Sequence, residues 1–266
     1  MECSNPYWLE VEDEHIPARC GRCVFCLIKK RKDWSYRCWI EHRHSIGSMF
    51  VTLTYDEQNV PDYKCLVKSD LQKYMKRLRK RVDSKIRYYA VGEYGTLHGR
   101  PHYHVLLFNV MPYDEVHVRE SWSKGQVHVG KVNAASIMYV LKYVVQPEQS
   151  TNKLQKPFVL MSRAYGIGGA YLSDDVVDWH RRTKTTYCRM HDQKVGMPKF
   201  FRDKIFYKEY DKAVTREKIK KQIEADKVRN DCELIRAGID VEKARKESRD
   251  FVVRQLKSKV QFTEKL

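Results

Sequence analysis

The sequence has no apolar run near the roughly 18 residues needed to cross a bilayer. Its amino terminus carries Glu2, Glu10 and Glu12 where a signal peptide would be basic and apolar. It also has no GxxxxGKS or GxxxxGKT phosphate-binding loop, which argues against an ATP-driven helicase domain. Internal repeats and low-complexity tracts are missing as well. We therefore expect a globular cytoplasmic protein without a membrane partner.

Acidic residues are scarce relative to basic ones. The 266 residues include 51 Lys and Arg but only 34 Asp and Glu, which gives a formal net charge of +17. A surplus of this size favours a polyanionic partner, with nucleic acid as the first candidate. The 17 tyrosines and 5 tryptophans fit that interpretation, because aromatic rings among basic residues can stack on unpaired bases.

Eight cysteines in a chain expected to be cytoplasmic indicate thiols or metal ligands rather than a disulfide framework. Cys20, Cys23 and Cys26 form a C-x2-C-x2-C run, and Cys3 could supply a fourth thiolate for a tetrahedral Zn²⁺ site. A cubane iron–sulfur cluster is the second interpretation, although the fourth cysteine before proline that usually completes such a run is missing. The third interpretation is simple thiols that precede a helix.

Periodicity outlines an α+β domain. We predict a helix over 28–44, strands over 49–55, 86–93, 102–108 and 126–132, and a helix that starts at Ser69 with a capping box. The turn over 95–101 suggests a hairpin that brings Glu93 close to the strand at 102–108. Asn133 is a plausible N-cap for a further helix, which Pro147 ends. The chain is turn-rich after Ser150, and two charged helices follow from about 211, broken at Gly238 and restarted by Asp240.

The strand at 102–108 carries two imidazoles on one face. Side chains alternate along a strand, so His102 and His104 project together while Tyr103 points the other way. With Glu93 as the third ligand, these residues could hold Mg²⁺ or Mn²⁺ and leave positions open for a phosphate. The alternative is that both histidines lie on the solvated face of an antiparallel strand.

The helix after Asn133 carries two tyrosines one turn apart. Tyr139 and Tyr143 share a face with Lys142, roughly opposite the aliphatic Val140 and Leu141. A phenol is a weak nucleophile, so it needs an electrophile that is already polarised, and Lys142 could stabilise a phenolate. Packing of both tyrosines on a neighbouring strand is the alternative. The histidine pair favours the catalytic interpretation.

These segments together resemble the HUH endonucleases, and within them the replication initiators of microviruses of the gokushovirus branch, which are single-stranded DNA phages. FVTLTY at 50–55, GEYGTLHGRPHYHVLLF at 92–108 and YVLKYV at 139–144 occur in the family's order. The amino-terminal CGRCVFC and the basic helix after it are also similar to these phage proteins. The resemblance implies a central five-stranded antiparallel sheet flanked by helices, a cysteine-rich amino-terminal segment and a charged helical tail.

The resemblance also implies a reaction. Tyr139 or Tyr143 would attack an origin phosphate, keep the 5′ end as a phosphotyrosine and release a 3′ hydroxyl that primes rolling-circle synthesis. A host helicase and DNA polymerase would be borrowed in the bacterial cytoplasm. We expect a cysteine-rich segment with a basic helix over 1–45, the endonuclease core over 46–150, a turn-rich extension over 151–210 and the tail over 211–266.

Basic side chains on the first helix and in the metal motif are candidate DNA contacts, because each neutralised phosphate releases counterions. They are Lys29, Lys30, Arg31, Lys32, Arg37 and Arg100. The basic run at Lys76, Arg77, Arg79, Lys80 and Arg81 receives the same interpretation, and a solvated face is the alternative for both groups.

Other functions stay open at this point. A transposase or mobilisation relaxase would use the same chemistry. A zinc-stabilised DNA-binding regulator would keep the sheet without cutting, and a protein that binds structured RNA would use the same basic surface.

Overall fold

The computed structural model describes residues 3–11, 14–95, 99–142, 155–190 and 192–263. The chain divides into two compact units. One unit is Cys26–Ala170 with Thr263–Leu266, and it contains the predicted motifs. The other is Met1–Phe25 with Tyr171–Phe262.

The first unit is built on a five-stranded sheet, and every strand pairs antiparallel to its neighbours. The strand order is β6-β3-β5-β4-β7, so β5 is central and β6 and β7 are the edges. The bounds are β3 Ser48–Tyr55, β4 Arg87–Tyr94, β5 Pro101–Phe108, β6 Gly125–Lys131 and β7 Phe158–Met161. The expected α+β class with a five-stranded antiparallel sheet is therefore confirmed. The strand β7 was not predicted, since the residues after 150 were interpreted as turn-rich.

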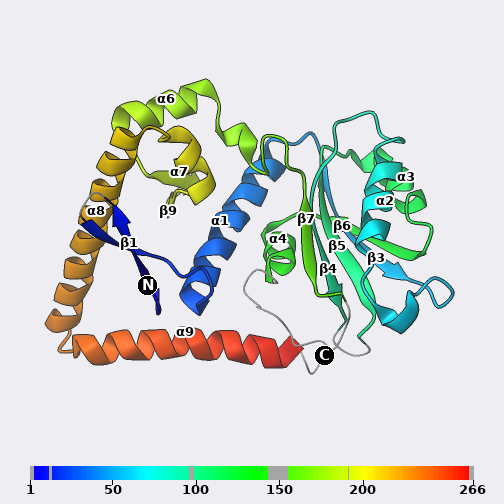
Figure 1. The fold of residues 1–266 in the computed structure, drawn as a ribbon. Helices are drawn as coiled ribbons and strands as arrows, with labels where there is room; N and C mark the ends of the chain where they lie inside the picture. The colour runs from blue at the N-terminus through cyan, green and yellow to red at the C-terminus, as the bar shows by residue number, and fades with distance from the viewer. Residues whose placement is uncertain (1–2, 12–13, 96–98, 143–154, 191, 264–266) are drawn as a thin grey trace. The chain divides into compact units, whose positions relative to one another are not determined.

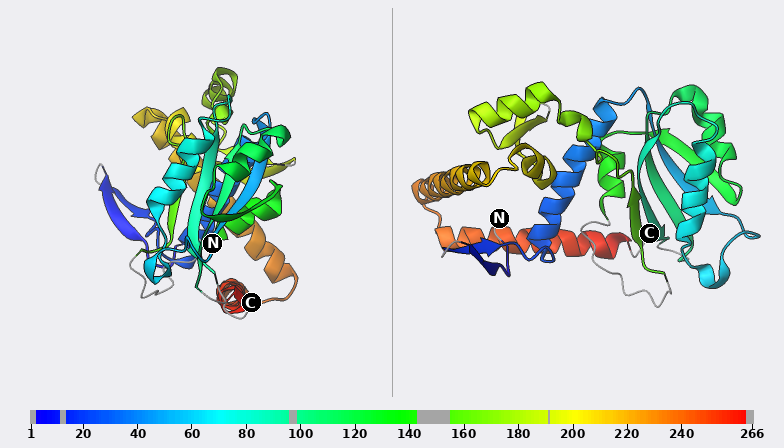
Figure 2. Two further views of the ribbon diagram at one scale, coloured as in Figure 1. Left: turned by 90° about the vertical axis from the view of Figure 1, so that its right-hand side faces the viewer. Right: turned by 45° about the horizontal axis from the view of Figure 1, so that its top comes forward.

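Helices cover both faces of this sheet (Figures 1 and 2). The helices α2 (Lys68–Leu78) and α3 (Glu115–Glu120) lie on one side, while α1 (Val24–Arg43) and α4 (Ala134–Val140) lie on the other. Each face of β5 belongs to a different core, because successive side chains alternate. Tyr103, Val105 and Leu107 pack in the core under α2. Leu106 and Phe108 pack with Cys38, Ile137 and Val140 in the other core.

The start of α2 differs from the prediction. The helix begins at Lys68 with Val67 as its N-cap, and no side chain caps it. The hydroxyl of Tyr103 accepts a hydrogen bond from the Val67 N–H at 3.0 Å and donates one to the Val67 carbonyl at 2.9 Å. The predicted Ser69 cap is therefore wrong, because a buried tyrosine from the sheet fixes the chain two residues earlier. The predicted apolar stripe is confirmed, with Leu71, Met75 and Leu78 all buried.

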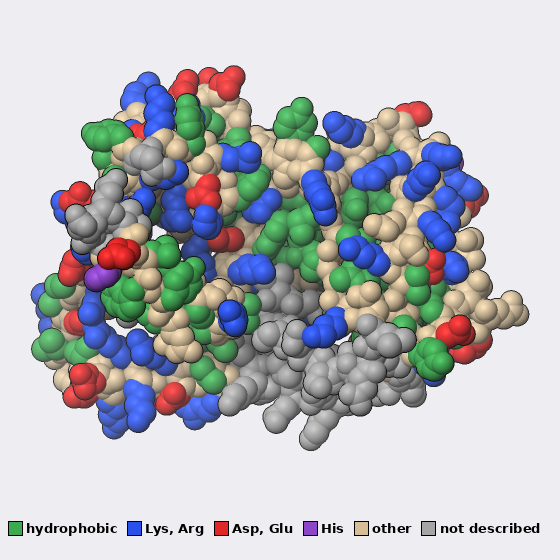
Figure 3. Space-filling view, viewed as in Figure 1, with side chains coloured by type: hydrophobic (Ala, Val, Ile, Leu, Met, Phe, Trp, Pro, Cys, Tyr) green, Lys and Arg blue, Asp and Glu red, His purple; other side chains and the backbone are tan. Residues whose placement is uncertain are grey.

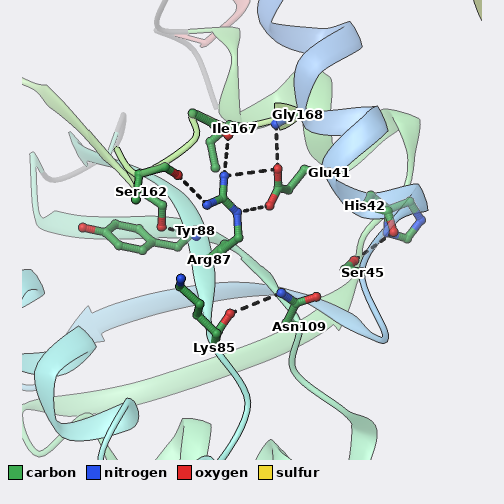
Figure 4. A network of polar contacts seen from close by, with 12 residues as sticks. Glu41, His42, Ser45, Lys85, Arg87, Tyr88, Asn109, Ser162, Ile167 and Gly168 are labelled. Atoms are coloured by element: carbon green, nitrogen blue, oxygen red, sulfur yellow. Dashed lines mark hydrogen bonds and ion pairs between the residues drawn. The ribbon is translucent and has the colours of Figure 1, made fainter. Parts of the chain in front are cut away.

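A polar network joins α1 to the sheet (Figure 4). Arg87 of β4 forms an ion pair with the buried Glu41 of α1 and donates hydrogen bonds to the carbonyls of Ala164 and Gly166. The Gly168 N–H donates to the second Glu41 oxygen at 2.6 Å. Three segments distant in sequence therefore meet at one carboxylate, and this fixes α1 across the sheet.

The second unit is mainly helical. Its elements are β1 Tyr7–Val11, β2 Glu14–Ala18, α6 Asp174–Thr183, β8 Tyr187–Met190, β9 Gln193–Gly196, α7 Lys199–Ile205, α8 Glu209–Arg236 and α9 Val241–Thr263. Strands β1 and β2 form one antiparallel hairpin, and β8 and β9 form another. The two charged helices at the carboxy-terminal end are confirmed. Asp240 caps the second by accepting a hydrogen bond from the Lys243 N–H at 2.7 Å.

Short 3-10 turns at Asp62–Lys64, Pro112–Asp114 and Gly169–Tyr171 complete the described secondary structure. Among the described helices, none is long and apolar enough to span a membrane.

Candidate active site

The histidine pair lies on the central strand, where an apolar core gives way to polar groups. On one face of β5 the side chains run from Phe108 through Leu106 to His104 and His102. The first two are fully buried, His104 is 5% exposed and His102 is half-buried. The packing that fixes the strand therefore also fixes the imidazoles, and one end of the pair meets the surface.

The predicted hairpin brings Glu93 to both histidines. Glu93 of β4 is directly opposite His102 in the β4–β5 register. Its Oε1 atom lies 2.8 Å from His102 Nε2 and 2.9 Å from His104 Nε2. The carboxylate is 2% exposed, and its Oε2 atom is buried without a hydrogen-bond partner.

This arrangement fits a divalent cation. His102 Nδ1 lies 3.1 Å from the carbonyl oxygen of Arg100, which can only accept, so Nδ1 carries the proton. In a neutral imidazole Nε2 then presents a lone pair toward the Glu93 carboxylate, and only a cation or a second proton relieves that contact. One ligand atom from each of the three residues lies within 4.8 Å of the others. The unpartnered Oε2 atom is a further available ligand.

Burial and charge oppose each other at this cluster. Burial pushes the Glu93 pKa up, but the hydrogen bonds from His102 and His104 and the charge of Lys142 outweigh it, so the pKa lies below its ordinary value. Burial lowers the pKa of His104, and Glu93 offsets part of that effect. Glu93 is therefore ionised at neutral pH and His104 tends to be neutral, the protonation states that metal ligands need.

Tyr139 reaches the cluster from α4. Asn133 caps this helix as predicted, with its side chain accepting from the Ser136 N–H at 2.9 Å. Ile137 and Val140 are buried in the core, whereas Tyr139 is 42% exposed. The Tyr139 hydroxyl lies 3.4 Å from His104 Nε2, and the two rings meet edge to face with centroids 4.9 Å apart.

The environment of Tyr139 disfavours its phenolate. Burial and the negative charge of Glu93 raise the pKa of Tyr139 to about 12. Lys142 Nζ lies 4.0 Å from the centroid of the Tyr139 ring and 3.8 Å from Glu93 Oε1. Burial lowers the pKa of Lys142, and Glu93 partly restores it. The predicted trio Glu93, Tyr139 and Lys142 is therefore brought together. Tyr143 and Pro147 lie outside the described residues.

Two neighbours of the cluster were not predicted as site residues. Thr52 Oγ1 lies 3.0 Å from His104 Nδ1, on the side of the ring away from Glu93. The Phe50 ring stacks on His104 at a centroid distance of 5.6 Å and meets Tyr139 edge to face at 6.2 Å. Both residues belong to the FVTLTY segment, whose alternation places Phe50, Thr52 and Thr54 on one face. Only the pairing of Thr52 with His104 shows which face that is.

The same face of the sheet continues toward the edge strand. Thr52 pairs with His128 and Thr54 pairs with Gln126 in the β3–β6 register, so all four side chains share the face of the histidine pair. Thr52 and Thr54 are half-buried, and Gln126 and His128 are exposed. An accessible polar strip therefore leads from the cluster across β3 to β6.

The predicted basic contacts are spread over several environments. Lys30 and Lys32 are exposed on α1, whereas Lys29 forms an ion pair with Asp33. Arg31 is half-buried, and burial lowers its pKa. Arg37 lies 3.9 Å from the centroid of the Trp34 ring and donates to the Ile167 carbonyl at 2.9 Å.

The other basic residues lie on the sheet and on α2. Arg100 forms an ion pair with Glu57 at 2.5 Å. Lys and Arg side chains gather over α2 and α3 (Figure 3), on the side of the sheet away from the cluster. Of the predicted run on α2, Lys76, Arg79 and Lys80 are exposed. Arg77 donates to the Ser121 carbonyl and Arg81 forms an ion pair with Glu120.

A second group of metal-binding side chains is formed by cysteines. The Sγ atoms of Cys3, Cys20, Cys23 and Cys26 all lie within 4.8 Å of one another. The four residues predicted as zinc ligands are thus brought together. The described residues therefore contain two groups that could hold a metal ion.

Comparison with known proteins places the central part of this chain among phage replication proteins. Residues 48–148 match the family model of the replication-associated protein ORF2 and gene 2 protein family. This match spans β3 through α4, the elements that carry the histidine pair, Glu93 and Tyr139. No solved structure matches the chain.

Curated relatives extend the similarity beyond that region. Replication-associated protein ORF4 of Chlamydia phage 1 is 26% identical over 225 residues, covering 73% of this chain and 55% of the relative. Replication-associated protein VP4 of Bdellovibrio phage phiMH2K is 25% identical over 211 residues, covering 69% and 66%. Replication-associated protein ORF2 of Spiroplasma virus 4 is 28% identical over 162 residues, covering 51% and 49%. The chain thus spans about half to two thirds of the length of these relatives. The predicted relationship to microvirus replication proteins is confirmed.

Proposed function

We propose that this protein initiates rolling-circle replication of a small single-stranded DNA phage genome by nicking and rejoining the origin through a phosphotyrosine. The observation that carries the proposal is the position of the Tyr139 hydroxyl, 3.4 Å from His104 Nε2 at the edge of the Glu93 cluster. Residues 46–150 are our proposed endonuclease core. The matched replication proteins support the general role.

Glu93, His102 and His104 would hold one Mg²⁺ or Mn²⁺ ion. When bound, that ion would polarise the scissile phosphate and offset the negative charge of Glu93 that faces Tyr139. A carboxylate and two imidazoles are suitable ligands for such an ion. The ionised Glu93 and the neutral His104 described above support this assignment.

The residues around Tyr139 orient and shield the nucleophile. Edge-to-face contacts with Phe50 and His104 hold the phenol ring, and the Lys142 ammonium lies over its face. Lys142 is thus placed to stabilise negative charge on the phenol or on a phosphate oxygen. Because α4 packs through Ile137 and Val140, the hydroxyl keeps a fixed position relative to the cluster.

The reaction we propose is a transesterification. The phenolic oxygen of Tyr139 bonds to phosphorus, the bond from phosphorus to the 3′ oxygen breaks, and the 3′ oxygen takes up a proton in place of the one the phenol loses. A free 3′ hydroxyl attacks the phosphotyrosine in the reverse step and releases the tyrosine. One phosphodiester replaces another, so joining needs no ATP. Tyr143 remains our proposal for the second nucleophile.

Single-stranded DNA is the proposed substrate, and the polar strip on β3 and β6 is its proposed path. Thr54, Gln126 and His128 offer hydrogen bonds to bases or phosphates, and Phe50 offers a ring beside the nucleophile. Exposed Lys30 and Lys32 remain candidate backbone contacts. A host helicase and polymerase in the bacterial cytoplasm would act on the nicked product.

The two ends of the nick test this proposal. Circular single-stranded phage DNA is incubated with the protein and Mn²⁺, and the product is then given to a DNA polymerase or to a polynucleotide kinase without any proteinase. We expect a 3′ end that the polymerase extends and a 5′ end that resists labelling until the protein is digested. A 5′ end that is open to labelling would contradict a covalent intermediate, and binding without a nick would favour a non-catalytic regulator.

A further inference from the structure

The four clustered cysteines lie at the two ends of the amino-terminal hairpin. Cys3 precedes β1, Cys20 and Cys23 follow β2, and Cys26 lies in the first turn of α1. The Sγ atoms of Cys3 and Cys23 are 3.8 Å apart, and no disulfide joins the described cysteines. The cluster thus brings the first described residue together with cysteines that follow the whole hairpin in the sequence.

The sulfur spacing matches a metal site and excludes a disulfide. Bonded sulfur atoms are about 2.05 Å apart. Four thiolates at about 2.3 Å from a tetrahedral zinc ion stand about 3.8 Å from one another. The separation of Cys3 and Cys23 has that value, and the whole group lies within 4.8 Å.

The backbone around the cluster favours sulfur anions. The Cys20 N–H points at Cys3 Sγ at 3.3 Å, and the Cys23 N–H points at Cys20 Sγ at 3.3 Å. Backbone hydrogen bonds from Cys23 and Arg22 hold the pKa of the Cys20 thiol below its ordinary value. Hydrogen bonds of this kind stabilise a thiolate, which is the form that binds metal.

The segment has little else to hold it in place. Among the described residues from 3 to 24, none is buried, and Tyr7, Trp8 and Leu9 are all strongly exposed. The first buried side chain is that of Phe25. A hairpin without an apolar core is marginal in water, so a metal crosslink would supply stability that packing does not.

We propose that Cys3, Cys20, Cys23 and Cys26 bind one structural Zn²⁺ ion. A closed set of four thiolates leaves no open position, which is typical of structural and not of catalytic zinc. Thiolates select zinc or iron–sulfur clusters, while the Glu93 cluster, with its carboxylate, suits magnesium or manganese. The chain would therefore hold two metals of different chemistry, and this inference does not depend on the nuclease proposal.

Metal content tests the proposal directly. The full-length protein is produced with zinc in the medium and purified in a reductant without chelators, and its zinc and iron are measured by mass spectrometry. We expect about one zinc per chain, little iron and no acid-labile sulfide. Iron with sulfide would replace zinc by a cluster, and a folded protein with neither metal would overturn the proposal.

Cysteine variants assign the metal to this site. Cys20→Ser and Cys23→Ser should lose most of the zinc, whereas the matched control Cys232→Ser, an exposed cysteine on α8, should keep it. His102→Ala should also keep it, which separates this site from the Glu93 cluster. Equal zinc in Cys20→Ser and Cys232→Ser would contradict the assignment.

Cobalt substitution tests the geometry without a mutation. Co²⁺ exchanged into the wild-type protein should show the intense visible bands of tetrahedral cobalt and a sulfur-to-cobalt charge-transfer band. Limited proteolysis should then cut within residues 3–23 faster after chelation than before. A weak octahedral cobalt spectrum, or cleavage that chelation does not change, would overturn the structural role.

Discussion

The hydroxyl of Tyr139 and the Nε2 atom of His104 are 3.4 Å apart, although the two residues come from a helix and from the central strand. The distance is short because α4 packs its aliphatic side on β5 while β5 turns its histidines to the same face. A nucleophile and a cation-binding group can therefore act on one phosphate without a rearrangement of the fold.

Replacing Glu93 by Gln should separate binding from cutting. The amide keeps the shape of the side chain but removes the charge that a divalent ion needs, so we expect Mn²⁺-dependent cleavage to fall more than about 100-fold. Binding of single-stranded DNA should change little. The control Glu120→Gln alters an exposed carboxylate on α3 and should cut normally. Cleavage by the Glu93 variant at the normal rate would refute metal binding here.

Thr52→Val should weaken metal binding without touching a ligand. The Thr52 hydroxyl lies 3.0 Å from His104 Nδ1, and outer partners of this kind typically contribute 10- to 100-fold (about 1.4 to 2.7 kcal/mol) to metal affinity. Thr54→Val is the matched control, since it lies on the same face of β3. Calorimetric titration with Mn²⁺ measures the difference. Equal affinities of the two variants would show that Thr52 does not position His104.

The strip on β6 should contribute to DNA affinity. We expect Gln126→Ala combined with His128→Ala to weaken binding of a single-stranded origin oligonucleotide by about 10-fold, because hydrogen bonds to the strand are lost. The salt dependence should not change, since neither change removes a permanent charge. Gln72→Ala combined with His44→Ala, both exposed elsewhere, is the control. Equal losses in the two double variants would refute this path.

The helical unit should become less stable in acid because of His180. This side chain is fully buried between the Tyr171 hydroxyl and the Thr185 carbonyl, and burial lowers its pKa below 6.5. Below pH 6.5 the unfolded chain binds a proton that the native state does not, so stability falls with decreasing pH until the native pKa is reached. The slope is at most about 1.4 kcal/mol per pH unit.

Denaturant unfolding between pH 7.5 and pH 5 measures this effect. His180→Gln should show a smaller loss of stability across that range than the wild type, and the exposed His44→Gln should behave like the wild type. If the wild type and His180→Gln lose the same stability, the buried imidazole is not the cause.

Local signals predicted much of this site. Alternation along 102–108 placed His102 and His104 together, and the short turn before Pro101 placed Glu93 across from them. Asn133 was predicted as a cap because its side chain bonds only three residues away. Each of these inferences needed no knowledge of distant contacts.

The missed features depend on pairing between distant segments. Thr52 and His128 become neighbours of the site only through the register of β3 with β5 and β6. The predicted cap at Ser69 failed because Tyr103, from another strand, binds the backbone of Val67. The strand β7 is four residues long and adds to the edge beside β4, so its own sequence carries little signal.

The measurement that tests the central claim most directly is peptide mass spectrometry of the protein after reaction with origin DNA and Mn²⁺. We predict a nucleotide adduct on the peptide that contains Tyr139, absent in Tyr139→Phe unless Tyr143 takes over, and unchanged in the control Tyr113→Phe, whose tyrosine is 74% exposed. Nicked DNA without an adduct on either Tyr139 or Tyr143 would contradict the account.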